Sequence, residues 1–212
     1  MSQATKAGER ASYANGQRRR AEIVDAATTV FATEGFRRLS LRQIAEEIGT
    51  NHVSLKYHFG SKDGLLEAVL ARREENEGPW REQLLRERGF LDGTVEVMRR
   101  NAGNRGLIRL DTTLQAEATT PDHPAHEFIR RREELFFASV LEQLQLESGR
   151  GHLRDGLDLA VVARQFIALV EGIQVQWLYD ETVDMAAHVD AFMDYLRSSP
   201  RSTGDDAAGN AR

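Results

Sequence analysis

The chain has 212 residues, of which 41% are hydrophobic, so it can bury a sizeable core in one large or two smaller domains. It contains no cysteine, which excludes disulfides, thiol catalysis and cysteine-ligated metal sites. The polar N-terminus lacks the apolar segment of a secretory signal, and Arg164, Gln165 and Glu171 interrupt the most apolar region. We therefore expect a cytoplasmic protein that does not span a membrane.

The formal net charge of −5 is unevenly distributed along the chain. Residues 1–62 carry ten Lys and Arg against six Asp and Glu, a net charge of +4, which leaves −9 for the other 150 residues. Such a split suggests a DNA-facing module attached to an acidic body. Uneven charge is common in proteins, however, and does not decide the function alone.

Apolar residues recur at three- and four-residue spacing throughout, which predicts an all-α fold. Residues 1–17 are small and polar, and we expect them to form a mobile arm. A first helix is predicted from Arg18 to Glu34. In the second helix, Ser40 and Gln43 form a capping box, and Gly49 ends it.

A third, short helix is predicted at residues 52–58. Leu55 and Phe59 share its inner face, whereas Val53 and Tyr57 lie nearly opposite. Two short helices joined by a three-residue turn are typical of a helix-turn-helix, whose second helix enters the major groove of DNA. The outward pair is then expected to face base edges. Periodicity alone leaves an alternative about equally open, namely burial of the pair against another part of the same chain.

Polar side chains around this outward pair are suited to DNA contacts. Asn51 can cap the third helix, and Ser61 the next one. A valine can contact a thymine methyl group, and hydroxyl, amide, imidazole and ammonium groups can bind bases or phosphates. The candidates are Asn51, His52, Ser54, Lys56, His58 and Lys62.

The helix that follows Ser61 is expected to break or kink at Gly78-Pro79, a candidate pivot. Rough spans for the remaining helices are 79–88, 94–101, 105–118, 124–147, 157–180 and 185–196. Residues 198–212 are expected to form a disordered tail. We therefore predict a helix-turn-helix domain at residues 18–62 and a larger helical domain at residues 63–197.

The segment from Arg20 to Leu66 resembles the DNA-binding domain of the tetracycline-repressor (TetR) family. The landmarks at matching spacing are Ile23, Ala26, Ala27, Phe31, Gly35, Phe36, Ser40, Ile44, Ala45, Gly49, Leu55, His58, Phe59, Ser61 and Lys62. The resemblance implies a homodimeric regulator, usually a repressor, with a C-terminal domain for ligand binding and dimerisation. Such a protein binds a palindromic double-stranded DNA operator and releases it when a small-molecule effector enters the C-terminal domain.

Carried over by position, the resemblance also implies individual contacts. Base or groove contacts fall on Arg42, His52, Val53, Ser54 and Tyr57. Phosphate contacts fall on Thr50, Lys56, His58 and Lys62. The family usually has a tyrosine where this chain has Lys56, so here an ammonium group replaces an aromatic phosphate contact.

Other candidates have plain structural alternatives. Arg18, Arg19 and Arg20 form either a basic arm that reaches DNA or a solvated helix start. The aromatic ligand-binding candidates are more often plain core residues, and the glutamines could simply face solvent. These candidates are Trp80, Gln115, Phe128, Phe166, Gln174 and Trp177. His123 and His126 could bind a metal, but helix capping is favoured, and we expect no metal or cofactor.

No nucleophile–base pair or phosphate-binding loop is evident, so we do not expect an enzyme. The leading hypothesis is an effector-responsive transcriptional regulator whose last two helices form the dimer interface. The alternative is an effector-independent architectural or constitutive DNA-binding protein with a solidly packed body.

Overall fold

The computed structural model describes residues 3–36 and 38–199, with side chains from residue 14 onward. Eight helices occur in this part of the chain, and apart from one isolated bridge it contains no strand pairing, which confirms the all-α prediction. Their bounds are α1 (Gln3–Glu34), α2 (Leu41–Glu47), α3 (His52–Phe59), α4 (Lys62–Ala102), α5 (Arg105–Glu117), α6 (His126–Gly149), α7 (Leu159–Tyr179) and α8 (Met185–Leu196). The predicted tail lies outside the described residues, except for Ser198 and Ser199.

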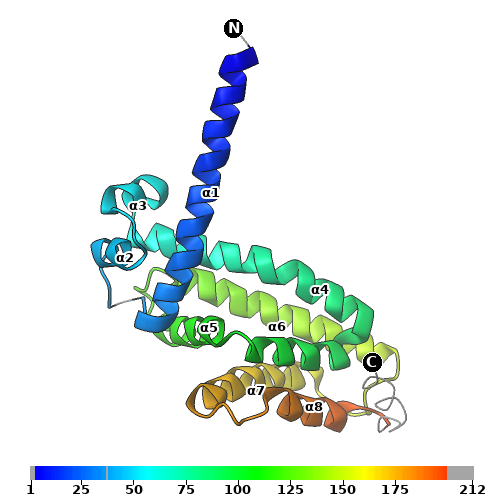
Figure 1. The fold of residues 1–212 in the computed structure, drawn as a ribbon. Coiled ribbons are helices and arrows are strands. Elements are labelled where there is room, and N and C mark those ends of the chain that lie inside the picture. The colour runs from blue at the N-terminus through cyan, green and yellow to red at the C-terminus, as the bar shows by residue number, and fades with distance from the viewer. Residues whose placement is uncertain (1–2, 37, 200–212) are drawn as a thin grey trace, which may run out of the picture. The chain divides into compact units, whose positions relative to one another are not determined.

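The chain divides into two compact units. Unit 1 contains Met1–Trp80 and Asn104–Arg130, and unit 2 contains Arg81–Gly103 and Arg131–Arg212. Unit 1 therefore combines the predicted helix-turn-helix with α5, which lies far along the chain. The two short helices α2 and α3 pack against each other, and α1 packs against α2 and α5 (Figure 1).

The core of unit 1 holds the predicted inner faces of its helices. Phe31 from α1, Ile44 from α2, Leu55 from α3 and Leu66 from α4 are all at most 1% exposed. Leu110 from α5 belongs to the same cluster and is also 1% exposed. Burial of these side chains is the main favourable term that holds the two short helices, which are too short to be stable alone.

The start of α1 differs from the prediction. The helix begins at Gln3 rather than at Arg18. The intervening residues are polar, but they include Ala, Lys, Glu, Gln and Arg, which are good helix formers, and no proline. Their polarity, which suggested a mobile arm, does not oppose helix formation.

The predicted break at Gly78-Pro79 is wrong. α4 continues through Pro79, and its only non-helical backbone lies at Gly89, with φ 74° and ψ 170°. Pro79 is exposed, so water can reach the carbonyl that loses its helical N–H partner. The break falls instead where glycine permits a positive φ.

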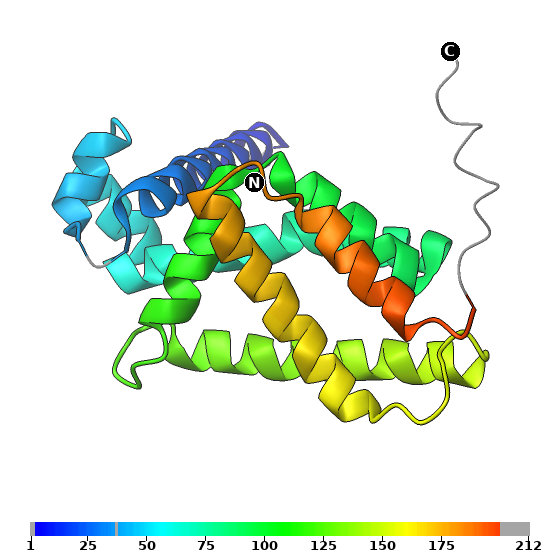
Figure 2. The same ribbon diagram turned by 90° about the horizontal axis from the view of Figure 1, so that it is seen from below.

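Unit 2 is built around α7 and α8, which a short turn joins into a hairpin (Figure 2). Phe166 on α7 packs edge-on against Phe90, with ring centroids 5.5 Å apart. In the turn, Asp180 Oδ1 accepts hydrogen bonds from the Thr182 hydroxyl at 2.7 Å and the Thr182 N–H at 3.0 Å. These bonds lower the pKa of the Asp180 carboxyl.

By length and composition alone, α7 is the one helix in the described part of the chain that could cross a membrane. Seven of its residues are buried in unit 2: Val162, Ala163, Phe166, Ile167, Val170, Ile173 and Trp177. The core helix of a soluble protein has the same composition, so this single helix is weak evidence for a membrane span.

Gly89→Ala should lower the free energy of unfolding by about 1–3 kcal/mol, because its backbone lies in a region that only glycine readily adopts. A Cβ atom at this position would meet only Glu147 Oε1, at 3.7 Å, so the cost is backbone strain rather than a clash. The matched control is Gly78→Ala, where a helical backbone and open space predict a gain of about 0.5–1 kcal/mol. Urea unfolding followed by circular dichroism, at equal protein concentrations, measures both; similar effects would contradict the assignment of the break.

Candidate DNA-binding site

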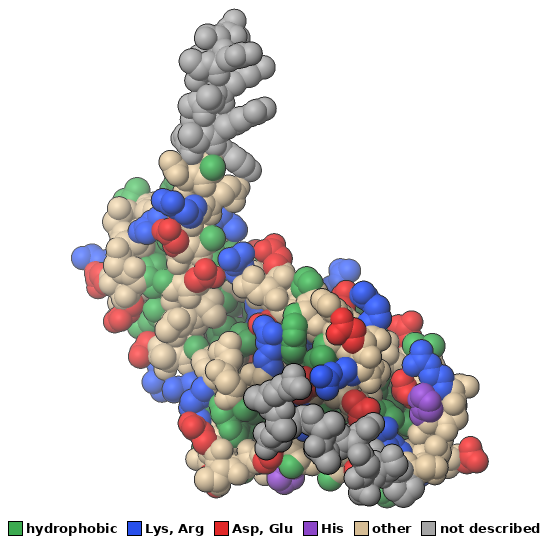
Figure 3. Space-filling view, turned by 45° about the vertical axis from the view of Figure 1, so that its right-hand side comes forward, with side chains coloured by type: hydrophobic (Ala, Val, Ile, Leu, Met, Phe, Trp, Pro, Cys, Tyr) green, Lys and Arg blue, Asp and Glu red, His purple; other side chains and the backbone are tan. Residues whose placement is uncertain are grey.

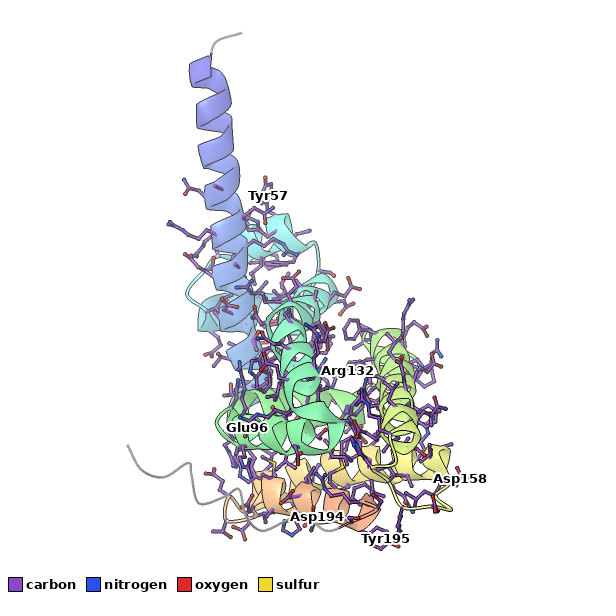
Figure 4. All side chains as sticks on the ribbon, turned by 90° about the vertical axis from the view of Figure 1, so that its right-hand side faces the viewer. Tyr57, Glu96, Arg132, Asp158, Asp194 and Tyr195 are labelled. Carbon is purple, nitrogen blue, oxygen red and sulfur yellow. The ribbon has the colours of Figure 1, made fainter. Side chains whose placement is uncertain are left out.

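The third helix presents its two faces as predicted. Leu55 is fully buried, whereas Val53 is 74% exposed and Tyr57 is 84% exposed. The Tyr57 side chain projects away from the body of unit 1 (Figure 4). In the described chain the outward pair is therefore not buried within its own protomer, which removes the alternative that periodicity left open.

The turn before α3 is fixed by local hydrogen bonds. Gly49 adopts a φ of 67°, and the Thr50 N–H donates to the Ala45 carbonyl at 2.8 Å. Asn51 Oδ1 then accepts from the Ser54 N–H at 2.7 Å, which confirms the predicted cap. The second helix starts from its own confirmed capping box between Ser40 and Gln43.

Most of the candidate contact residues are accessible to solvent. His52, Lys56, Tyr57 and Arg42 are exposed, and Ser54 and His58 are half-buried. Arg42 lies on α2, where its Nε is 3.2 Å from Glu46 Oε1. This exposed pair contributes little to stability, so the guanidinium can exchange Glu46 for a DNA acceptor at small cost.

Lys62 has internal partners that the sequence did not reveal. Its Nζ donates to the carbonyls of Phe36 at 3.0 Å and Leu39 at 3.1 Å, and lies 4.2 Å from the centre of the Phe36 ring. Two of the three ammonium N–H groups are thereby used to hold the α1–α2 connection. Ser61 Oγ also accepts from the Gly64 N–H at 3.0 Å, which confirms it as a cap of α4.

Of the three arginines of α1, Arg18 and Arg19 lie near an acid, and Arg19 and Arg20 contact the helix-turn-helix. Arg18 and Arg19 approach Glu22 at 3.6 and 3.4 Å. Arg19 also donates to the Thr50 hydroxyl at 3.3 Å, and the Arg20 guanidinium lies 5.1 Å from the centre of the Phe59 ring. Basic and acidic side chains are accordingly seen side by side on this part of α1 (Figure 3).

The ligand-binding candidates are divided between the two units. Trp80, Gln115 and Phe128 are half-buried in unit 1. Phe166 and Trp177 are buried core residues of α7 in unit 2, and Gln174 is half-buried on the same helix. Aromatic character in the sequence did not distinguish a pocket wall from a packed core.

The two histidines around Pro124 are used as hydrogen-bond partners. His123 Nδ1 accepts from the Ala125 N–H at 3.1 Å, and His126 Nδ1 lies 2.7 Å from the Ala118 carbonyl. Across the described residues, no three His, Asp or Glu side chains are grouped so that they could hold a metal ion.

Comparison with known proteins agrees with this geometry. Residues 23–69 match the family described as bacterial regulatory proteins, tetR family. The transcriptional repressor KstR2 of Rhodococcus jostii is 30% identical over 111 residues, which cover 50% of this chain and 46% of that protein.

Solved structures match over most of the chain. A TetR-family transcriptional regulator from Rhodococcus sp. is 25% identical, with a TM-score of 0.65, and the match covers 86% of this chain and all of the other. A transcriptional regulator from Saccharomonospora viridis in complex with choline has the same coverage, 22% identity and a TM-score of 0.75.

An outward-facing second helix on a capped helix-turn-helix, within an all-helical chain, defines a DNA-binding transcriptional regulator. Its residues 23–69 match the tetR family of bacterial regulatory proteins, and the chain is similar over most of its length to a TetR-family regulator.

Proposed function

We propose that the protein is a repressor that binds a palindromic operator as a homodimer and releases it when a small molecule binds the helical body. The observation that carries this proposal is the exposed Val53 and Tyr57 on α3, backed by the buried Leu55. Residues 18–62 form the DNA-binding domain, residues 63–197 bind the effector and the second protomer, and the protein acts in the cytoplasm.

The contacts follow from the chemistry of the exposed groups. Tyr57 and Val53 offer apolar surface to thymine methyl groups, and His52, Ser54 and Arg42 offer hydrogen bonds to base edges. Thr50, Asn51, Lys56, His58 and the remaining N–H of Lys62 face phosphates. Arg18 and Arg19 extend the positive surface, because a phosphate can displace the weakly bound Glu22.

Tyr57→Ala should reduce the preference for the selected operator to the level of random DNA without changing the fold, because Tyr57 is 84% exposed and makes no core contact. The operator is the duplex that the wild-type protein selects from a random-sequence pool, and gel shifts measure the preference. The control is Leu135→Ala, a 61% exposed apolar side chain on α6 that lies outside both the helix-turn-helix and the α7–α8 hairpin, which should leave the preference unchanged. Retained selectivity in Tyr57→Ala would refute the assignment of this face to DNA.

The α7–α8 hairpin supports the homodimer. Its exposed surface includes Val161 at 50%, Val175 at 41% and Tyr179 at 90% exposure. Residue 168 between the two valines is an exposed alanine, so apolar positions recur every seven residues along α7. This spacing suits lateral packing against the helices of a second copy, and a dimer places two recognition helices about 34–36 Å apart.

Val175→Glu should convert the dimer to a monomer, because a carboxylate at the centre of an apolar interface loses its hydration without gaining a partner. Analytical ultracentrifugation measures the mass. The matched control is Leu135→Glu on α6, an apolar side chain that is 61% exposed but lies outside the hairpin. A dimer that survives Val175→Glu, or is lost equally in the control, would place the interface elsewhere.

Effector release draws support from relatives rather than from the site itself. KstR2 is named as a repressor, and the regulator from Saccharomonospora viridis is described in complex with choline. A ligand that binds more tightly to the conformation with the lower DNA affinity must weaken DNA binding. It does so by the same factor by which bound DNA weakens binding of the ligand. The alternative, an effector-independent DNA-binding protein, requires no such ligand.

A thermal-shift screen of small metabolites, with choline among them, tests this part. A ligand at 100 times its Kd should raise the stability of the folded protein by about 2.7 kcal/mol and raise the melting temperature accordingly. The same ligand should lower the affinity for the selected duplex. A ligand that stabilises the protein yet leaves DNA affinity unchanged would favour the effector-independent alternative.

A further inference from the structure

The connection between α5 and α6 contributes one buried histidine to unit 1. His123 is 3% exposed, and its Nδ1 accepts the Ala125 N–H at 3.1 Å. In the neutral ring the proton therefore sits on Nε2, which lies 3.7 Å from Glu117 Oε2 on α5. With one ring nitrogen bound to the backbone and the other facing a carboxylate, the imidazole is held in one orientation.

The ring of His123 packs against the segment that leads into the helix-turn-helix. It meets Phe36 edge-on, with centroids 5.5 Å apart and an interplanar angle of 66°. Phe36 lies two residues beyond the end of α1 and is itself 3% exposed. On another side, Phe36 receives Lys62, both through its carbonyl at 3.0 Å and through its ring at 4.2 Å.

The partners of Phe36 bear on both helices of the motif. Lys62 also binds the carbonyl of Leu39, the residue before the Ser40 cap of α2. Lys62 is the first residue of α4, and only Gly60 and Ser61 separate it from α3. The position of Phe36 therefore constrains two segments of the chain. One is the segment that leads into α2, through Leu39, and the other is the segment that follows α3, through Lys62.

We propose that His123 is a positioning residue for DNA binding: the edge contact of its ring with Phe36 fixes where α2 and α3 stand, without touching DNA. This inference rests on the proposed function of α3. His123 lies in the α5–α6 connection, 64 positions beyond the end of α3. Through Phe36 it determines part of the geometry on which operator affinity depends.

Two substitutions separate the ring contact from the backbone hydrogen bond. In His123→Asn, the amide oxygen takes the place of Nδ1 as acceptor for Ala125, but the ring against Phe36 is lost. In His123→Phe, the ring remains and the acceptor is lost. Affinity is measured on the duplex that the wild-type protein selects from a random-sequence pool, at a temperature where circular dichroism shows each variant folded.

His123→Asn is expected to weaken this affinity about tenfold, whereas His123→Phe stays within about threefold of wild type. His123→Phe should nevertheless melt about 3 °C or more below wild type, because the Ala125 N–H loses its partner. The slope of log affinity against log salt should be unchanged in both variants, since a buried ring that does not reach DNA neutralises no phosphate. Lys56→Ala, as a control, should flatten that slope by about 0.9.

Wild-type affinity in folded His123→Asn, or an equal loss in both variants, would overturn the proposal. If His123→Asn does not fold, Phe36→Leu removes the same ring pair from the other side and must show the same tenfold loss with an unchanged salt slope. Normal affinity in Phe36→Leu would then overturn it. A wild-type protein that selects no duplex would instead contradict the proposed function.

Discussion

The burial of Leu55 is the contact on which the orientation of the recognition helix depends. α3 has eight residues and could not persist alone, so its place is set by what it buries in the core of unit 1. Side chains two positions away on a helix point to nearly opposite sides. Once Leu55 is fixed inward, Val53 and Tyr57 have no position other than the outer surface. The surface offered to DNA is thus a geometric consequence of a core contact.

The rest of the motif is held by polar contacts at the ends of its helices and in the connections between them. Ser40 and Asn51 fix the starts of α2 and α3, and Lys62 ties the connection before α2 to the start of α4. An ammonium group can do this because its donors reach two carbonyls at once, whereas an apolar residue at position 62 would leave both carbonyls without a donor. Cationic character alone does not make this lysine a phosphate ligand.

The features that the sequence predicted well are those whose information is local. The capping box, the Asn51 cap and the two faces of α3 depend on residues three or four positions apart. The acceptors of Lys62 lie 23 and 26 residues away, and the contact of His123 with Phe36 spans 87 residues, so no short-range pattern could reveal them. Pro79 illustrates the opposite error, because a strong local signal predicted a break that does not occur. The helix continues there because Pro79 is exposed and water can reach the carbonyl that lacks an N–H partner.

The Asn51 cap limits what this residue can recognise. Because its side-chain oxygen is turned toward the Ser54 N–H, the group left to meet a duplex is the NH₂, which only donates. Through this NH₂ group, Asn51 can match hydrogen-bond acceptors, such as a phosphate oxygen or the N7 and O6 atoms of guanine, but not the amino group of cytosine. A single hydrogen bond at the start of α3 thereby leaves Asn51 with a donor rather than an acceptor to present to a ligand.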